Sequence, residues 1–208
     1  MKLIIFGSTG TIGQLLVQKA LELDHEVTAF ARNSEKLAQI KNSRLTICEG
    51  DVMQAGKVAK AIEGQDVVLC ALGAGRKGSV RSTGTKHIIE GMEKNDVKRL
   101  ICQTTLGNGD SKGNLNFFWK YIMFGWFLKD AYLDHEQQEN HILNSKLDWT
   151  IVRPAAFTDG KITGLYKHGF GPEDKKIKLK ISRADVALFM LMQVTDSRYV
   201  RKTPGLSY

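Results

Sequence analysis

The first thirteen residues constrain the fold more than any other stretch of the chain. A short apolar run at residues 3–6 is followed at once by Gly-Ser-Thr-Gly-Thr-Ile-Gly at positions 7–13, and then by a helical pattern. This order of strand, glycine turn and helix suits a pyrophosphate. Gly7 allows a sharp turn, Gly10 lets the anion approach the backbone, and Gly13 lets the helix pack close to the strand. A plain strand-to-helix turn is the alternative, because glycines mark many turns.

Strand and helix patterns alternate along most of the chain. The expected strands are residues 2–6, 25–30, 45–48, 66–70, 98–103 and 149–152. The expected helices are 12–23, 35–39, 54–62, 82–94, 133–145 and 183–194. This alternation predicts an α/β Rossmann fold with a doubly wound, mainly parallel sheet. The length fits a single domain, residues 1–208, with a small substrate-side region around 154–180.

The ends of two later elements can also be predicted. Ser82 or Thr83 is a suitable N-cap for the helix at 82–94, because a hydroxyl can accept from the free amides of a first turn. The tail at 199–208 is expected to add an edge strand.

Composition limits the partners that the chain can have. Its net charge is +8, but the basic residues are scattered, so we expect no nucleic-acid binding; a positive field suits a polyanionic small ligand such as NADP. Only at 175–180 do lysines alternate, which predicts a strand with one solvated face. No apolar run reaches the roughly 18 residues of a membrane span, and no signal-peptide pattern is seen, so a cytoplasmic location is expected.

The cysteines do not indicate metal or disulfide chemistry. Cys48, Cys70 and Cys102 each lie in an apolar, strand-like segment, and none belongs to a Cys-x-x-Cys pair. We expect reduced core residues and no metal site.

The tips of the second and third expected strands point to the adenosine end of a dinucleotide. The second strand ends in Ala-Arg-Asn-Ser at 31–34, where an acid would favour NAD. Arg32 instead offers a planar fork of donors for a 2′-phosphate, with Ser34 as a further donor or a helix cap, so NADP(H) is favoured over NAD(H). Asp51 could accept from the adenine amine, with the Val52 amide serving the ring, or could begin the turn before the next helix; both interpretations stay open.

The fourth expected strand leads into Ala-Leu-Gly-Ala-Gly at 71–75. Backbone at Leu72 and Gly73 could lie against the cofactor near its nicotinamide ribose. The basic residues that follow, Arg76, Lys77 and Arg81, could reach phosphate or substrate, or simply be surface charge.

Five segments together resemble a known family. They are the glycine turn at 7–13, Ala-Arg-Asn at 31–33, Gly-Asp-Val at 50–52, Arg-Pro at 153–154 and Ile-Ser-Arg-Ala-Asp-Val-Ala at 181–187. The chain resembles the atypical short-chain dehydrogenase/reductases, in particular the NAD(P)H-binding group with biliverdin-IXβ reductase/flavin reductase, and more distantly the NmrA-like proteins. The resemblance implies an NADP-binding Rossmann fold and reduction of flavins, quinones or related conjugated acceptors.

The resemblance also implies roles for individual residues. The pyrophosphate turn falls on Gly7, Thr9, Gly10, Thr11, Ile12 and Gly13, the 2′-phosphate arginine on Arg32, and the adenine-side acid on Asp51. The hydroxyl residue after the fifth strand falls on Thr105, with Thr104 beside it. One active-site histidine falls on His135, whereas a second falls on Ala156 and is absent.

The Tyr-x-x-x-Lys pair of typical short-chain dehydrogenases is missing, since no tyrosine has a lysine four positions on. Such a pair protonates the carbonyl oxygen as hydride arrives. Flavins and quinones accept hydride directly and can take the proton from solvent, so the departure favours a reductase of conjugated acceptors over an alcohol dehydrogenase.

Two features between the fifth and sixth strands have open interpretations. The aromatic stretch at 115–128 could wall a site for a flat ring, or could pack on the body or on a second subunit, which allows a homodimer. His135 shares a helix face with Tyr132 and Glu139 by spacing, and could supply a proton or be an ordinary hydrogen-bonded residue.

The favoured function is an NADPH-dependent reductase of a flavin-, quinone- or biliverdin-like acceptor; the alternative is a non-catalytic NADP-sensing regulator.

Overall fold

A computed structural model of the chain describes residues 1–75 and 78–208. Its centre is an eight-stranded sheet in the order β3-β2-β1-β4-β5-β6-β10-β8. Neighbouring strands in this sheet are parallel except for β10 and β8. The strands are β1 (Lys2–Phe6), β2 (Glu26–Ala31), β3 (Leu45–Glu49), β4 (Val67–Cys70), β5 (Arg99–Gln103), β6 (Asp148–Pro154), β8 (Lys167–His168) and β10 (Gly205–Ser207). A separate pair, β7 (Ala156–Thr158) and β9 (Lys180–Ser182), is also parallel.

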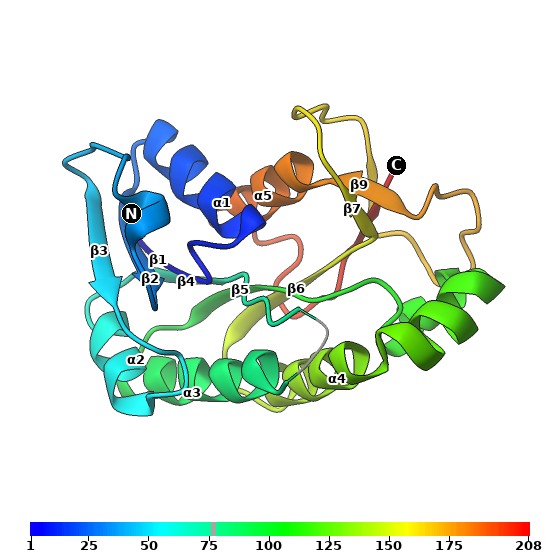
Figure 1. Ribbon diagram of the computed structural model, residues 1–208, viewed down its shortest axis with the longest axis horizontal. Coiled ribbons are helices and arrows are strands. Elements are labelled where there is room, and N and C mark those ends of the chain that lie inside the picture. The colour runs from blue at the N-terminus through cyan, green and yellow to red at the C-terminus, as the bar shows by residue number, and fades with distance from the viewer. Residues whose placement is uncertain (76–77) are drawn as a thin grey trace.

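Helices cover both faces of the sheet, as Figure 1 shows. On one face lie α1 (Thr11–Glu22) and α5 (Arg183–Met192), which pack on each other; on the other lie α2 (Ala55–Ile62), α3 (Val80–Lys94) and α4 (Lys129–Leu143). Three further helices are η1 (Glu35–Leu37), η2 (Gly109–Asn114) and the π-helix η3 (Phe118–Phe127). The predicted doubly wound α/β fold is confirmed.

Strand β1 shows why its apolar run is continuous. Leu3 and Ile5 belong to the core under α1 and α5, whereas Ile4 and Phe6 belong to the core under α2, α3 and α4. All four side chains are fully buried. Because a parallel sheet is covered on both faces, both alternating sets of side chains must be apolar.

The strand order fixes where a ligand can bind. From β1 the chain continues outward to β2 and β3, and it then returns to β4 on the other side of β1. The reversal leaves a crevice beyond the carboxyl ends of β1 and β4, where open α/β sheets bind their ligands.

Three expectations about local structure are wrong. Helix α3 begins at Val80 and not at residue 82, and neither Ser82 nor Thr83 caps it. The Asp134 carboxylate of α4 accepts from the amides of Arg81 and Ser82 instead, and so caps the helix from a distant part of the chain. The tail strand β10 lies between β6 and β8 rather than at the edge. Of the lysine run at 175–180, only its last residue lies in a strand.

The cysteines match their expected state in part. Cys70 and Cys102 are free and buried on adjacent strands, whereas Cys48 is free but only half-buried.

Candidate functional site

The glycine turn has the geometry that its sequence predicts. Gly7 has φ +79°, and a Cβ there would overlap the carbonyl oxygen of Ala71. A Cβ on Gly13 would overlap the backbone of Gly7, so this glycine lets α1 start directly against the turn. Gly10 is the N-cap of α1 and donates its amide to the Gly7 carbonyl at 2.9 Å. The free amides of the first turn of α1 therefore face the crevice, as an anion site requires.

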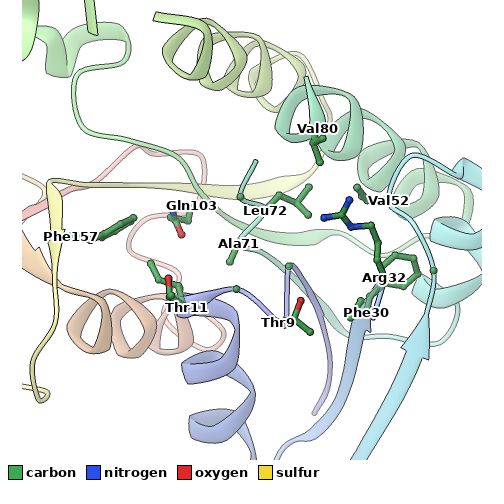
Figure 2. Close-up of a pocket in the computed structure, with 16 residues that line it drawn as sticks. Thr9, Thr11, Phe30, Arg32, Val52, Ala71, Leu72, Val80, Gln103 and Phe157 are labelled. Atoms are coloured by element: carbon green, nitrogen blue, oxygen red, sulfur yellow. The ribbon is translucent and has the colours of Figure 1, made fainter. Parts of the chain in front are cut away.

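A cavity of about 350 Å³ lies over this turn, and we call it the glycine cleft (Figure 2). It includes nine of the residues predicted to bind a dinucleotide: Gly7, Thr9, Gly10, Thr11, Ile12, Arg32, Val52, Leu72 and Gly73. The other lining residues are Phe30, Ala31, Gly50, Ala71, Val80, Gln103 and Phe157. The cleft thus joins the tips of β1, β2, β3, β4 and β5.

Arg32 lies at the β2 end of the glycine cleft, and Figure 2 shows its guanidinium on the side where Val52 lies. It is exposed and forms no ion pair with any residue that the structure describes. Arg32 and Thr9 also border a smaller cavity of about 180 Å³, together with Asn33, Glu35 and Lys36. An unpaired guanidinium beside a second cation suits a doubly charged phosphate group.

Ser34 does not face this site as a free donor. Its hydroxyl donates to the Glu49 carboxylate at 2.5 Å, which links the tips of β2 and β3.

Asp51 is not among the residues that line the glycine cleft. Its carboxylate accepts from the Met53 amide at 2.9 Å, and its carbonyl accepts from the Gln54 amide at 2.9 Å. The side chain is therefore engaged in the turn before α2. This contact favours the turn interpretation over adenine recognition, which leaves backbone of Gly50 and Val52 on the cleft wall.

A second cavity of about 380 Å³ adjoins the first, and we call it the aromatic pocket. The two cavities share Leu72, Gly73, Gln103 and Phe157. The rest of the wall is mostly apolar and consists of Arg81, Thr104, Thr105, Leu106, Leu115, Trp119, Phe124, Leu128, His135, Pro154, Ala155, Ala156, Leu179 and Arg183.

The two threonines on this wall differ in their freedom to bind a ligand. The Thr104 hydroxyl is buried and donates to the Glu139 carboxylate at 2.6 Å. Thr104 lines the aromatic pocket and not the glycine cleft, and its cofactor role stays a prediction. The hydroxyl of Thr105 makes only a 3.3 Å contact with the Leu106 carbonyl, so it remains able to bond a bound molecule.

His135 also lines the aromatic pocket, but it is neutral at pH 7. Desolvation, followed by the nearby charge of Arg81, lowers its pKa to about 4. The Gln138 amide nitrogen donates to Thr85 and Cys102, so its oxygen accepts from His135 Nδ1 at 3.0 Å. The proton therefore sits on Nδ1, and Nε2 is an acceptor. This state does not fit the predicted proton donor at neutral pH.

Buried ion pairs fix the elements around the aromatic pocket. Arg153 of β6 binds Glu139 of α4 through two nitrogens, at 3.0 and 2.7 Å, and both side chains are almost fully buried. Arg81 binds Asp134 at 3.2 Å and donates to the Gly75 carbonyl at 2.9 Å. Each buried carboxylate in this region thus has its own arginine.

The helix face predicted from Tyr132, His135 and Glu139 does not form one cluster. The Tyr132 hydroxyl donates to the Gly107 carbonyl at 3.1 Å, while the other two side chains have the partners given above. Within residues 1–75 and 78–208, no group of three His, Cys, Asp or Glu side chains could hold a metal ion.

The aromatic stretch at 115–128 contributes side chains both to the wall of the aromatic pocket and to the exposed surface. Trp119 and Phe124 wall the aromatic pocket, as one interpretation proposed. Phe117, Phe118 and Trp126 are 72%, 50% and 75% exposed, and no residue of η3 is buried. The half-buried Leu115 packs on the core and Phe124 packs on Tyr132, so part of the segment lies against the body of the chain, whereas packing on a second subunit stays a prediction.

Two positions of the polar loop, Arg76 and Lys77, lie outside the described residues.

The side chains that sequence reasoning missed are Gln103, Phe157 and Arg183. Gln103 ends β5, so its position at the carboxyl edge could have revealed it. Phe157 and Arg183 reach the site through the β7–β9 pairing, which no local pattern indicates.

The fold and the glycine cleft define a dinucleotide-binding Rossmann protein. The model of an NAD(P)H-binding protein family matches residues 7–197. The chain therefore belongs to this family of NAD(P)H-binding oxidoreductases, as the sequence motifs predicted.

Two curated relatives show how far the likeness extends. The UPF0659 protein YMR090W of Saccharomyces cerevisiae is 28% identical over 99% of this chain and 92% of its own length. The photosystem II assembly factor Ycf39 of a Synechocystis strain is 24% identical over 78% of this chain, and the match spans only 47% of that protein.

Solved structures share the whole fold. The oxidoreductase ylbE of Lactococcus lactis has a TM-score of 0.84 and 26% identity, over 100% of this chain and 90% of that one. The ChuY anaerobillin reductase of Escherichia coli O157:H7 has a TM-score of 0.83 and 24% identity, over 100% and 97%. A short-chain dehydrogenase/reductase of Veillonella parvula in complex with NADP has a TM-score of 0.85 and 20% identity, over 100% and 94%.

Proposed function

We propose that this protein is an NADPH-dependent reductase of a flat conjugated acceptor, such as a flavin, a quinone or a bilin. The observation that supports this most directly is the junction of the two cavities. The glycine cleft suits a dinucleotide, the aromatic pocket suits a planar ring, and they meet at Leu72, Gly73, Gln103 and Phe157. A nicotinamide bound at that junction would lie against an acceptor in the pocket.

The preference for NADPH over NADH is proposed from Arg32. Its guanidinium has no ion-pair partner among the described residues, and it also borders the smaller cavity that Lys36 lines. A 2′-phosphate would supply the missing anion, whereas a 2′-hydroxyl would not.

The residues that line the aromatic pocket position the acceptor and do not donate a proton to it. When bound, NADPH supplies the hydride, and proximity provides most of the rate. Thr105 donates a hydrogen bond to the acceptor or to the carboxamide. His135 is neutral with Nε2 as an acceptor, so it orients a donor group and the proton comes from solvent.

The proposal is tested by titrating the purified protein with NADPH and NADH, followed by addition of FMN, a quinone or biliverdin. We expect tight NADPH binding and oxidation of NADPH when an acceptor is added. Tight binding without oxidation by any acceptor would contradict the reductase proposal.

The second candidate is an NADP-sensing regulator that binds a protein partner. The exposed aromatic side chains of η3 favour it, because such a surface often marks an interaction site. The relative named as an assembly factor agrees with it. This candidate predicts cofactor-dependent capture of a partner and no turnover.

No helix in the described part of the chain is long and apolar enough to cross a membrane. A cytoplasmic location and a homodimer stay predictions.

A further inference from the structure

The aromatic pocket has an unusual distribution of charge. Its lining residues in the described chain include two arginines, Arg81 and Arg183, and no aspartate or glutamate. The charge of Arg81 is already matched, because this side chain binds the buried carboxylate of Asp134. The other buried carboxylate of the region, Glu139, is matched by Arg153. Arg183 is thus the cation of this pocket whose charge is least compensated.

The contacts of Arg183 leave part of its guanidinium unused. One terminal nitrogen binds Asp159 at 2.7 Å, but that carboxylate is 97% exposed, so water screens the pair. The Nε atom is buried and has no hydrogen-bond partner among the residues that the structure describes. A buried donor without a partner carries a desolvation cost, so the described residues do not fully satisfy this guanidinium.

The position of Arg183 is also fixed by packing. Its guanidinium lies 5.4 Å from the ring centre of Phe157, the aromatic residue shared by the two cavities. Arg183 begins α5 directly after β9, and β9 pairs with the strand that carries Phe157. Arg183 therefore lines the aromatic pocket beside the junction where hydride would be transferred.

We propose that Arg183 binds an oxyanion, a carboxylate or a phosphate, carried by the acceptor. The site therefore selects conjugated acceptors that have an anionic substituent over neutral ones. The guanidinium presents several donors in one plane, so it can bind two oxygens of such a group at once. This inference rests on the proposed reductase function, because it names the class of acceptor that the same pocket takes.

Matched pairs of acceptors test the proposal. FMN and riboflavin differ in the phosphate, and biliverdin and its dimethyl ester differ in the carboxylates. Binding of each is measured by fluorescence or absorbance to protein loaded with NADP⁺, so that no turnover occurs. We expect the anionic member of at least one pair to bind about tenfold more tightly, as for one charge-assisted hydrogen bond. A preference in the first pair identifies phosphate, and one in the second identifies carboxylate.

Variants assign that preference to one side chain. Arg183→Gln should remove the preference by weakening the anionic member more than the neutral one, Arg183→Lys should retain part of it, and Asp159→Asn should increase it. Arg198→Gln is the matched control, because Arg198 is exposed, pairs with Asp196 and does not line the pocket. Unchanged thermal unfolding of each variant shows that it is folded.

The result that overturns the inference is equal affinity within both pairs, or a preference that survives Arg183→Gln. NADPH oxidation assayed separately distinguishes this failure from that of the proposed function. Oxidation without anion preference refutes the role of Arg183 alone. Anion preference without oxidation by any acceptor refutes the reductase and leaves the anion site in place.

Discussion

The Arg32→Ala variant gives the sharpest test of the cofactor proposal. Arg32 is exposed and has no ion-pair partner in the described chain, so its removal breaks no internal contact. A hydrogen bond to a charged group contributes about 1.5–3 kcal/mol. Because solvent reaches this side chain, the lower half of that range applies, which corresponds to roughly a ten- to fortyfold weaker NADPH complex.

The measurement is a fluorescence titration of wild type and variant with NADPH and with NADH. NADH affinity should stay nearly unchanged, because NADH has a hydroxyl where NADPH has the phosphate. Lys36→Ala should weaken NADPH by a smaller factor, since a lysine at the rim acts as a more hydrated point charge. Arg198→Gln again serves as the control for loss of one exposed positive charge.

Equal weakening of both cofactors by Arg32→Ala would refute the 2′-phosphate role. Such a result would place the guanidinium at the pyrophosphate or adenine instead. Raising the salt concentration provides an independent check, because NADPH affinity should fall more steeply with salt in wild type than in the variant.

Three further predictions concern the framework of the site. Gly13→Ala should lower the melting temperature and abolish dinucleotide binding, since its Cβ would overlap the backbone of Gly7; calorimetry with and without NADPH measures both. Glu139→Gln should destabilise the fold by about 3 kcal/mol in urea unfolding, the lower end for a broken buried pair, because buried Arg153 keeps only the exposed carboxylate of Asp110. The folded-state pKa of His135, about 4, lies below its ordinary value of 6.5, so its neutral form stabilises the fold fully above pH 6.5 and this contribution falls as pH drops toward 4. His135→Gln should lose less stability between pH 7 and 5 than wild type, and equal losses would contradict the lowered pKa.

The cofactor half of the site could be predicted from the sequence because its determinants are local. The turn from Gly7 to Gly13, the tip at Arg32 and the loop at Gly73 each follow their own strand directly. A parallel sheet brings the carboxyl ends of its strands to one edge. Once the strands were identified, their loops had to meet, and all three line one cavity.

The predictions of hydrogen-bond partners were wrong where the partner lies far away in the sequence. The sequence of α3 suggests Ser82 or Thr83 as the cap, but Asp134, fifty-two residues beyond Ser82, accepts from the amides of the first turn. Spacing on α4 suggested a shared face for His135 and Glu139, yet the carboxylate binds Arg153 and the imidazole binds Gln138. No periodicity within a helix indicates which neighbour its polar side chains will meet.

The acceptor half depends on segments that meet only through tertiary pairing. Phe157 and Arg183 come together because β7 pairs with β9, and the aromatic wall comes from a π-helix between β5 and α4. Arg32 lines only the glycine cleft and Arg183 lines only the aromatic pocket. Substitutions at separated sites without shared partners have nearly additive effects. The double variant Arg32→Ala with Arg183→Gln should therefore show both losses, one in cofactor affinity and one in acceptor preference, each as large as in the single variant. A much larger loss in the double variant would show that the cofactor and acceptor sites are coupled through the junction at Phe157.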